Sequence, residues 1–132
     1  MAAALLPGRP LLYNGQEVES PQHLPLFERD PVAWNQADTI TPRAFYKRIL
    51  RIADTDSMFL SGQFGPVATG APKDVIAYSR GGAVVLVNAR NRAVKVTVSG
   101  FAVDGARELL TDGRMAGDTV SLGAYGAAVL ER

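Results

Sequence analysis

Apolar and polar positions in the second half of the chain follow the pattern of short β-strands. Residues 74–79 and 83–88 are rich in apolar and β-branched side chains, and the sequence Arg-Gly-Gly separates them. Because glycine adopts positive φ at little cost, Gly-Gly between two such runs predicts a β-hairpin. A second hairpin is expected across residues 89–92. Its return strand alternates, which places three side chains on the inward face: Val94, Val96 and Val98.

Three more runs, 106–111, 119–122 and 127–131, are expected to form strands, and glycine-containing turns separate them. Short strands at regular spacing with glycine turns are typical of an antiparallel β-sandwich. The sequence therefore predicts a mainly β fold for the second half of the chain.

The first half of the chain shows different patterns. Residues 1–6 are apolar and helix-prone, and the following Pro-Gly would stop a helix there. Residues 10–13 (Pro-Leu-Leu-Tyr) are apolar without alternation, which is typical of a strand buried on both faces. A polar, glycine-containing turn follows at 14–17. The carboxyl end of a buried parallel strand is where α/β barrels place active-site residues.

A helix is expected over residues 42–53. Thr41 suits the N-cap and Pro42 the first helical position. One side of this helix should be buried, because apolar residues recur along it at helical spacing: Phe45, Ile49 and Ile52. Prolines punctuate the stretch 19–41 before the helix. An irregular segment of that length inside a compact domain is usually functional, or else it indicates that the elements have been assigned wrongly.

Residues 8–19 resemble the eighth and last barrel strand of the α-amylase superfamily, glycoside hydrolase family 13. The family pattern Gly-x-Pro-Leu-x-Tyr-x-Gly-x-Glu is matched by Gly8, Pro10, Leu11, Tyr13, Gly15 and Glu17. Residues 26–34 resemble the loop that follows in the family, and the later helix resembles the last barrel helix. The resemblance covers essentially the whole chain. It implies that residues 1–56 are the terminal βα unit of an incomplete (β/α)8 barrel, and that 57–132 are a C-terminal Greek-key β-sandwich domain.

The resemblance implies an origin in an enzyme. The chain would be the C-terminal part of a glycoside hydrolase that acts on α-glucans such as starch or maltodextrin by a retaining mechanism. In the family, the catalytic carboxylates follow the fourth, fifth and seventh barrel strands, which have no counterpart here. No catalytic residue is therefore assigned, and the chain alone is expected to be inactive. The alternative is a non-catalytic β-sandwich module that binds carbohydrate or another protein.

The turn after the predicted strand and the loop beyond it supply the candidate substrate-binding residues, or residues that orient them: Tyr13, Asn14, Gln16, Glu17 and Trp34. Trp34 could stack on a sugar ring or pin its loop to the helix, and Tyr13 has the same two interpretations. Glu17 could contact substrate, or it could hydrogen-bond loop amides and shape the groove. An independent catalytic pair among the acidic residues of 17–30 is not indicated, because an open loop does not fix the separation of two carboxylates.

No metal or other cofactor is expected. The chain has no cysteine and a single histidine, His23, which argues against a zinc site. The acidic residues that invite a calcium interpretation lie in separate loops, where turn and cap roles explain them: Asp54, Asp56, Asp74 and Asp112.

The net charge of +1 gives no reason to expect nucleic acid or an anionic membrane as a partner, and no run is long enough to span a bilayer. The expected partner is an α-glucan bound by the full-length parent, and the sequence leaves the compartment open. A parallel strand without neighbours would expose its backbone edge, which predicts self-association through residues 8–18. Deleting residues 1–18 is then expected to leave the β-domain folded and more soluble.

Overall fold

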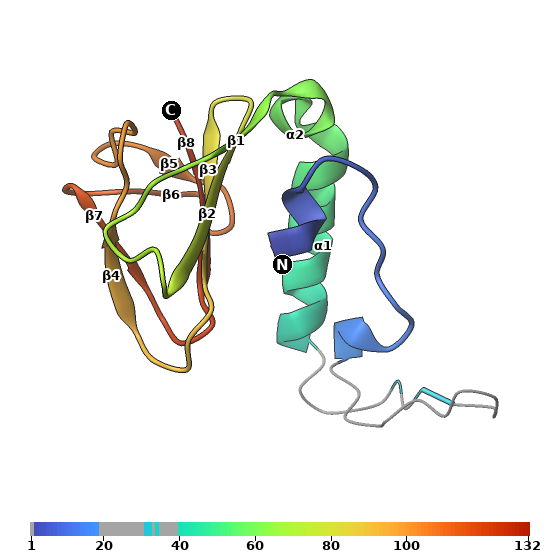
Figure 1. The fold of residues 1–132 in the computed structure, drawn as a ribbon. Coiled ribbons are helices and arrows are strands. Elements are labelled where there is room, and N and C mark those ends of the chain that lie inside the picture. Colours follow the sequence, from blue (N-terminus) through green and yellow to red (C-terminus); the bar gives the residue numbers. More distant parts are fainter. Residues whose placement is uncertain (1, 19–30, 33, 35–39) are drawn as a thin grey trace.

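A computed structural model describes residues 2–18, 31–32, 34 and 40–132 of the chain. In Figure 1 a β-sandwich lies on one side and a layer of helices lies against one of its sheets. The fold class is mainly β with antiparallel strands, as the sequence predicts.

The larger sheet has six strands in the order β1-β2-β3-β8-β5-β6. Its strands are β1 (Phe64–Pro66), β2 (Val75–Arg80), β3 (Ala83–Asn88), β8 (Ala127–Glu131), β5 (Arg107–Glu108) and β6 (Gly113–Arg114). The second sheet pairs β4 (Val94–Thr97) with β7 (Thr119–Leu122). Every pairing between these strands is antiparallel. The last strand, β8, follows β7 after residues 123–126 and pairs with β3, so the chain passes from the second sheet back into the large one.

The first predicted hairpin is confirmed. β2 pairs with β3, and Arg80 lies opposite Ala83 at the closed end. Gly81 and Gly82 form the turn with φ values of 58° and 111°, a backbone region in which a side chain would be strained.

The second predicted hairpin is wrong, because β4 pairs with β7 of the other sheet and not with β3. The connection 89–92 carries the chain from one sheet to the other. The side chain of Asn88 holds this crossing, since its Nδ2 donates 2.7 Å hydrogen bonds to the carbonyls of Arg92 and Gly123. A glycine-free connection before an alternating strand is compatible with β4 pairing with β3 or with β7, so the sequence did not distinguish these two pairings. The predicted inward face of β4 is confirmed, since three valines are buried: Val94, Val96 and Val98.

Two apolar cores share the six-stranded sheet. One lies between the two sheets and contains Leu86, Val96, Val120 and Leu130. The other lies between the outer face of the large sheet and the helices, and it contains Ile49, Phe59, Val85 and Val129. Because β3 is covered on both faces, its apolar run does not alternate.

The helix layer consists of α1 (Ile40–Thr55) and α2 (Ser57–Ser61). The predicted helix over 42–53 is confirmed and extends two residues further at each end, so Thr41 lies inside its first turn and not at the cap. α2 was not predicted. It begins after Asp56, whose Oδ1 accepts a 2.9 Å hydrogen bond from the Met58 amide.

The strand predicted over residues 10–13 is wrong. The described N-terminal segment forms two 3-10 helices, Ala2–Leu5 and Gln16–Val18, with irregular backbone between them. A parallel strand needs neighbours for its backbone hydrogen bonds, and no described strand lies beside this segment. The run is also not buried, since Leu11 is 89% exposed, whereas Leu5 lies within the helix-side core. The division into domains 1–56 and 57–132 stays a prediction.

Gly62 lies where α2 meets the tip of the β2–β3 hairpin, and we expect Gly62→Ala to destabilise the fold by about 2 kcal/mol through overpacking. An added Cβ would lie 2.3 Å from the Met58 carbonyl oxygen and 2.4 Å from the Gly81 Cα, and both are backbone atoms. Urea denaturation followed by circular dichroism measures the effect. Gly123→Ala is the matched control, because its Cβ would meet nothing within 4 Å. Equal stability of the two variants would contradict the close contact.

Candidate functional site

The predicted site residues at the N-terminal turn form a local hydrogen-bonded structure. The Tyr13 amide donates to Gln16 Oε1 at 2.9 Å, and the Gln16 amide donates to the Tyr13 carbonyl at 3.1 Å. The Glu17 carboxylate accepts a 3.2 Å hydrogen bond from the Gly15 amide. Asn14 lies exposed in the turn that these bonds close. Glu17 therefore bonds a loop amide, and contact of these residues with a substrate stays a prediction.

The two aromatic candidates are both accessible to solvent. Tyr13 is 54% exposed and Trp34 is 46% exposed. Each could offer a ring face to a ligand or to another part of a larger protein. His23 and residues 26–30 lie outside the described residues.

A groove separates the N-terminal segment from α1. Its larger part has a volume of about 760 Å³ and is lined by Pro10 from the segment and by Lys47, Leu50 and Arg51 from α1. A smaller part adds Leu12 and Tyr46. The wall residues Pro10 and Leu12 come directly before the predicted turn at 14–17 in the sequence. Of the predicted site residues, only Gln16 lines the groove.

Among the described residues, the predicted site holds no pair of carboxyl groups, and no metal-binding cluster is found. Glycoside hydrolysis needs two carboxyl groups, and the predicted site contains one, that of Glu17. Within the described ranges, no group of three His, Asp or Glu side chains could hold a metal ion. The described helices include none that is long and apolar enough to cross a membrane.

Asp112 ties α1 to the turn between β5 and β6. Its Oδ1 lies 2.8 Å from Arg107 Nη2 and 2.6 Å from Arg48 Nη2, while Arg48 Nε donates to the Leu109 carbonyl. Hydrogen bonds from Arg107 and then Arg48 lower the pKa of the Asp112 carboxyl below its ordinary value of 3.8. Asp74 is held in the same way by Arg90 and Arg92, and its pKa is also lowered, mainly by the hydrogen bond from Arg90.

Asp112→Asn should make the fold less sensitive to acid. A carboxyl whose pKa is lower in the folded state stabilises the fold above the unfolded pKa, and this contribution is lost as the pH falls through the folded value. We therefore expect the melting temperature of the variant to lie below that of the wild type at neutral pH and to converge with it below pH 3.8. Asparagine also tolerates the φ of 58° at this position.

Melting curves from about pH 7 to about pH 2 measure this convergence. Asp118→Asn, in an exposed turn without an ion pair among the described residues, is the control and should follow the wild type. A difference between Asp112→Asn and the wild type that stays constant with pH would contradict the role of the charge.

Tyr78 and Arg80 are buried beneath the helix layer and are not available for surface chemistry. Burial raises the pKa of Tyr78 to about 12, against the opposing charge of Arg80, so the phenol is neutral at physiological pH. Arg80 Nη2 donates to the Phe59 carbonyl at 2.8 Å. Tyr78 belongs to the apolar core between the large sheet and the helices.

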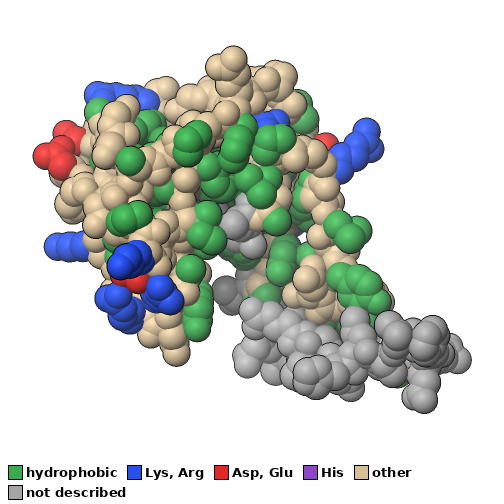
Figure 2. Space-filling model, viewed as in Figure 1, with side chains coloured by type: hydrophobic (Ala, Val, Ile, Leu, Met, Phe, Trp, Pro, Cys, Tyr) green, Lys and Arg blue, Asp and Glu red, His purple; other side chains and the backbone are tan. Residues whose placement is uncertain are grey.

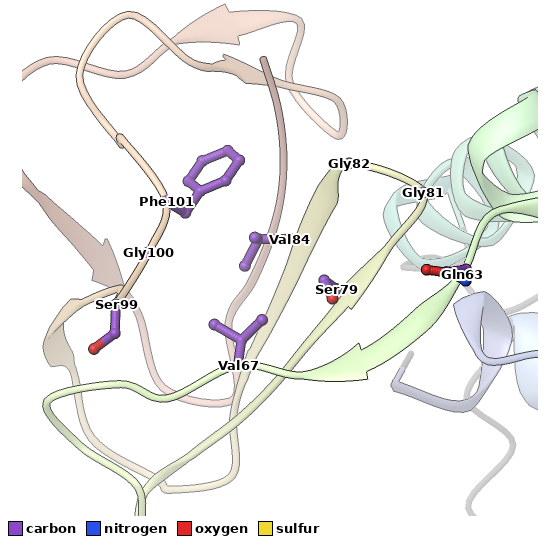
Figure 3. Close-up of a pocket in the computed structure, with 9 residues that line it drawn as sticks. All are labelled: Gln63, Val67, Ser79, Gly81, Gly82, Val84, Ser99, Gly100 and Phe101. Atoms are coloured by element: carbon purple, nitrogen blue, oxygen red, sulfur yellow. The ribbon is translucent and has the colours of Figure 1, made fainter.

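A second cavity opens at one end of the sandwich, between the β2–β3 turn and the loop that follows β4 (Figure 3). It has a volume of about 510 Å³ and is lined by Gln63, Val67, Ser79, Gly81, Gly82, Val84, Ser99, Gly100 and Phe101. Sequence reasoning missed it, because these residues come from separate segments and form no motif. Of the residues that line the cavity, only Gly81 and Gly82 belong to a recognisable sequence motif, and that motif predicts a hairpin and not a binding site.

No protein-family model matches the chain, and no curated protein matches it. Among solved structures, the chain is similar to a noncanonic maltogenic α-amylase from Thermotoga neapolitana, with a TM-score of 0.62 and 20% sequence identity. The match covers 96% of this chain and 32% of that chain, so this chain spans about a third of the length of that enzyme. At this level of identity the likeness is one of fold, and it includes nearly the whole chain.

Proposed function

We propose that this chain is the C-terminal part of an α-amylase-like glycoside hydrolase that acts on α-glucans by a retaining mechanism. The observation that carries the proposal is the fold similarity to a maltogenic α-amylase over 96% of the chain. The resemblance of residues 8–17 to the family pattern also supports it.

In this proposal the chain contributes structure and groove walls, and the catalytic carboxylates come from elsewhere in the longer protein. Tyr13, Asn14, Gln16, Glu17 and Trp34 would border the substrate groove. The turn that the Gln16 and Glu17 side chains close gives this border a fixed backbone shape. Such preformed walls lower the entropy lost when substrate binds.

The remaining barrel units would cover the apolar surface of the helix side. Figure 2 shows apolar side chains around the hollow between the sandwich and the helix layer. Large apolar residues also lie exposed on the N-terminal segment and α2, namely Leu11, Tyr13 and Leu60. In this proposal these three side chains become buried when the barrel units pack against them. Without that cover, we expect self-association through residues 8–18.

The test compares the chain with the product of the longer reading frame. The DNA upstream of the Met1 codon should continue in frame for about 300 residues or more, enough for seven further barrel units. The longer protein should hydrolyse maltoheptaose with retention at the anomeric carbon, and the 132-residue chain should not. A stop codon with a ribosome-binding site directly upstream, or hydrolysis by the short chain alone, would overturn the proposal.

A further inference from the structure

The cavity at the end of the sandwich has walls suited to a neutral ligand. None of its nine lining residues carries a charge. An ionic ligand entering it would lose hydration without gaining an ion partner, which is unfavourable. The volume of about 510 Å³ lies within the ~300–1,000 Å³ range of small-molecule sites.

The apolar wall of the cavity includes one aromatic ring. Phe101 is partly buried and packs against the core between the sheets, which fixes its position. Figure 3 shows Val67 and Val84 between Phe101 on one side and Ser79 and Gln63 on the other. A phenyl face carries negative partial charge and attracts the C–H groups on the apolar face of a pyranose.

Hydrogen-bonding groups lie at the opposite wall. Ser79 Oγ donates a long 3.3 Å hydrogen bond to the Gly65 carbonyl and keeps its lone pairs as acceptors. Gln63 adds an exposed amide side chain, which can both donate and accept. Gly82 and Gly100 also line the cavity, and a Cβ added at either would meet nothing within 4 Å, so there is open space beside the backbone at these positions.

From these observations we propose that the cavity is a non-catalytic binding site for one sugar unit of a neutral oligosaccharide. The apolar face of the ring stacks on Phe101, and its hydroxyl groups bond to Ser79 and Gln63. The choice of an α-glucan as the oligosaccharide rests on the proposed function, whereas the neutral sugar class rests on the cavity itself.

Maltotriose is the probe, titrated into the ¹⁵N-labelled 132-residue protein and followed by NMR. The amide signals of Gly81, Gly82 and Gly100 should shift and saturate. Phe101→Leu keeps the apolar packing but removes the ring face, and it should raise the dissociation constant about fivefold. Phe64→Leu is the matched control, because Phe64 contacts Tyr78 on the other face of the sheet and should leave binding unchanged.

Ser79→Ala gives a second measurement that does not depend on the packing of Phe101, and it should weaken binding about threefold or more. Absence of shifts with maltotriose, equal binding by Phe101→Leu and Phe64→Leu, or shifts centred on Trp34 would overturn the proposed site. Equal binding of the β-linked cellotriose would overturn the choice of an α-glucan. Failure of the proposed function is seen separately, in the hydrolysis assay of the longer protein.

Discussion

Replacing Leu5 by alanine is expected to lower the free energy of unfolding by about 3 kcal/mol. Leu5 is 1% exposed and lies in the helix-side core with Ile49, Phe59 and Val85. Removing its isobutyl group leaves a cavity between the N-terminal segment, α1 and the large sheet, and the rigid sheet cannot close it. Urea denaturation of the variant, followed by circular dichroism, measures the loss.

Leu11→Ala is the matched control, because it makes the same chemical change in the same segment at a residue that is 89% exposed. We expect it to change stability by no more than about 0.5 kcal/mol. The opposite ranking, with Leu11→Ala the costlier substitution, would mean that residues 10–13 form the buried strand that the sequence predicts. The burial of Leu5 also indicates that deleting residues 1–18 would uncover part of the sheet, contrary to the sequence-based expectation of a more soluble β-domain.

Local chemistry made the β-domain largely predictable. The Gly-Gly turn specifies the β2–β3 hairpin because few other residues adopt both required φ values. The alternation of β4 gave its inward face, since alternation depends on one strand alone. Its pairing partner was not predictable in the same way. β7 lies more than twenty residues further along the chain than β4. Pairing of β4 with β3 or with β7 would bury the same valines, so the burial of these valines does not distinguish the two partners.

The N-terminal segment shows the reverse case, in which resemblance to a sequence motif does not give the local structure. Residues 8–17 match a strand pattern, yet a parallel strand depends on hydrogen bonds from neighbouring strands, and the described residues supply none there. The same reasoning limits site prediction. The motif nominated Tyr13 to Glu17 because they are consecutive, whereas the cavity beside Phe101 forms only when distant segments meet.

Glu108→Ala is expected to cost about 4 kcal/mol of stability. The carboxylate is buried, with 7% exposure. Its two oxygens accept four hydrogen bonds, from the amides of Leu110, Thr111 and Val129 and from the Thr111 hydroxyl, at 2.6 to 3.1 Å. Alanine would leave these donors without an acceptor, and a buried polar group without a partner is costly.

The loss should concentrate where β5 meets β8, because Glu108 joins the turn after β5 to the backbone of β8. That turn also carries Asp112, so loosening it should weaken the ion pair that holds α1. Glu131→Ala is the matched control: its carboxylate is partly exposed, lies 3.9 Å from Arg107, and should contribute no more than about 0.5 kcal/mol. Urea denaturation of both variants separates them, and equal stability would refute the role of Glu108. Hydrogen exchange measured on Glu108→Ala tests the mechanism, since the Val129 amide should lose protection before the amides that pair β2 with β3.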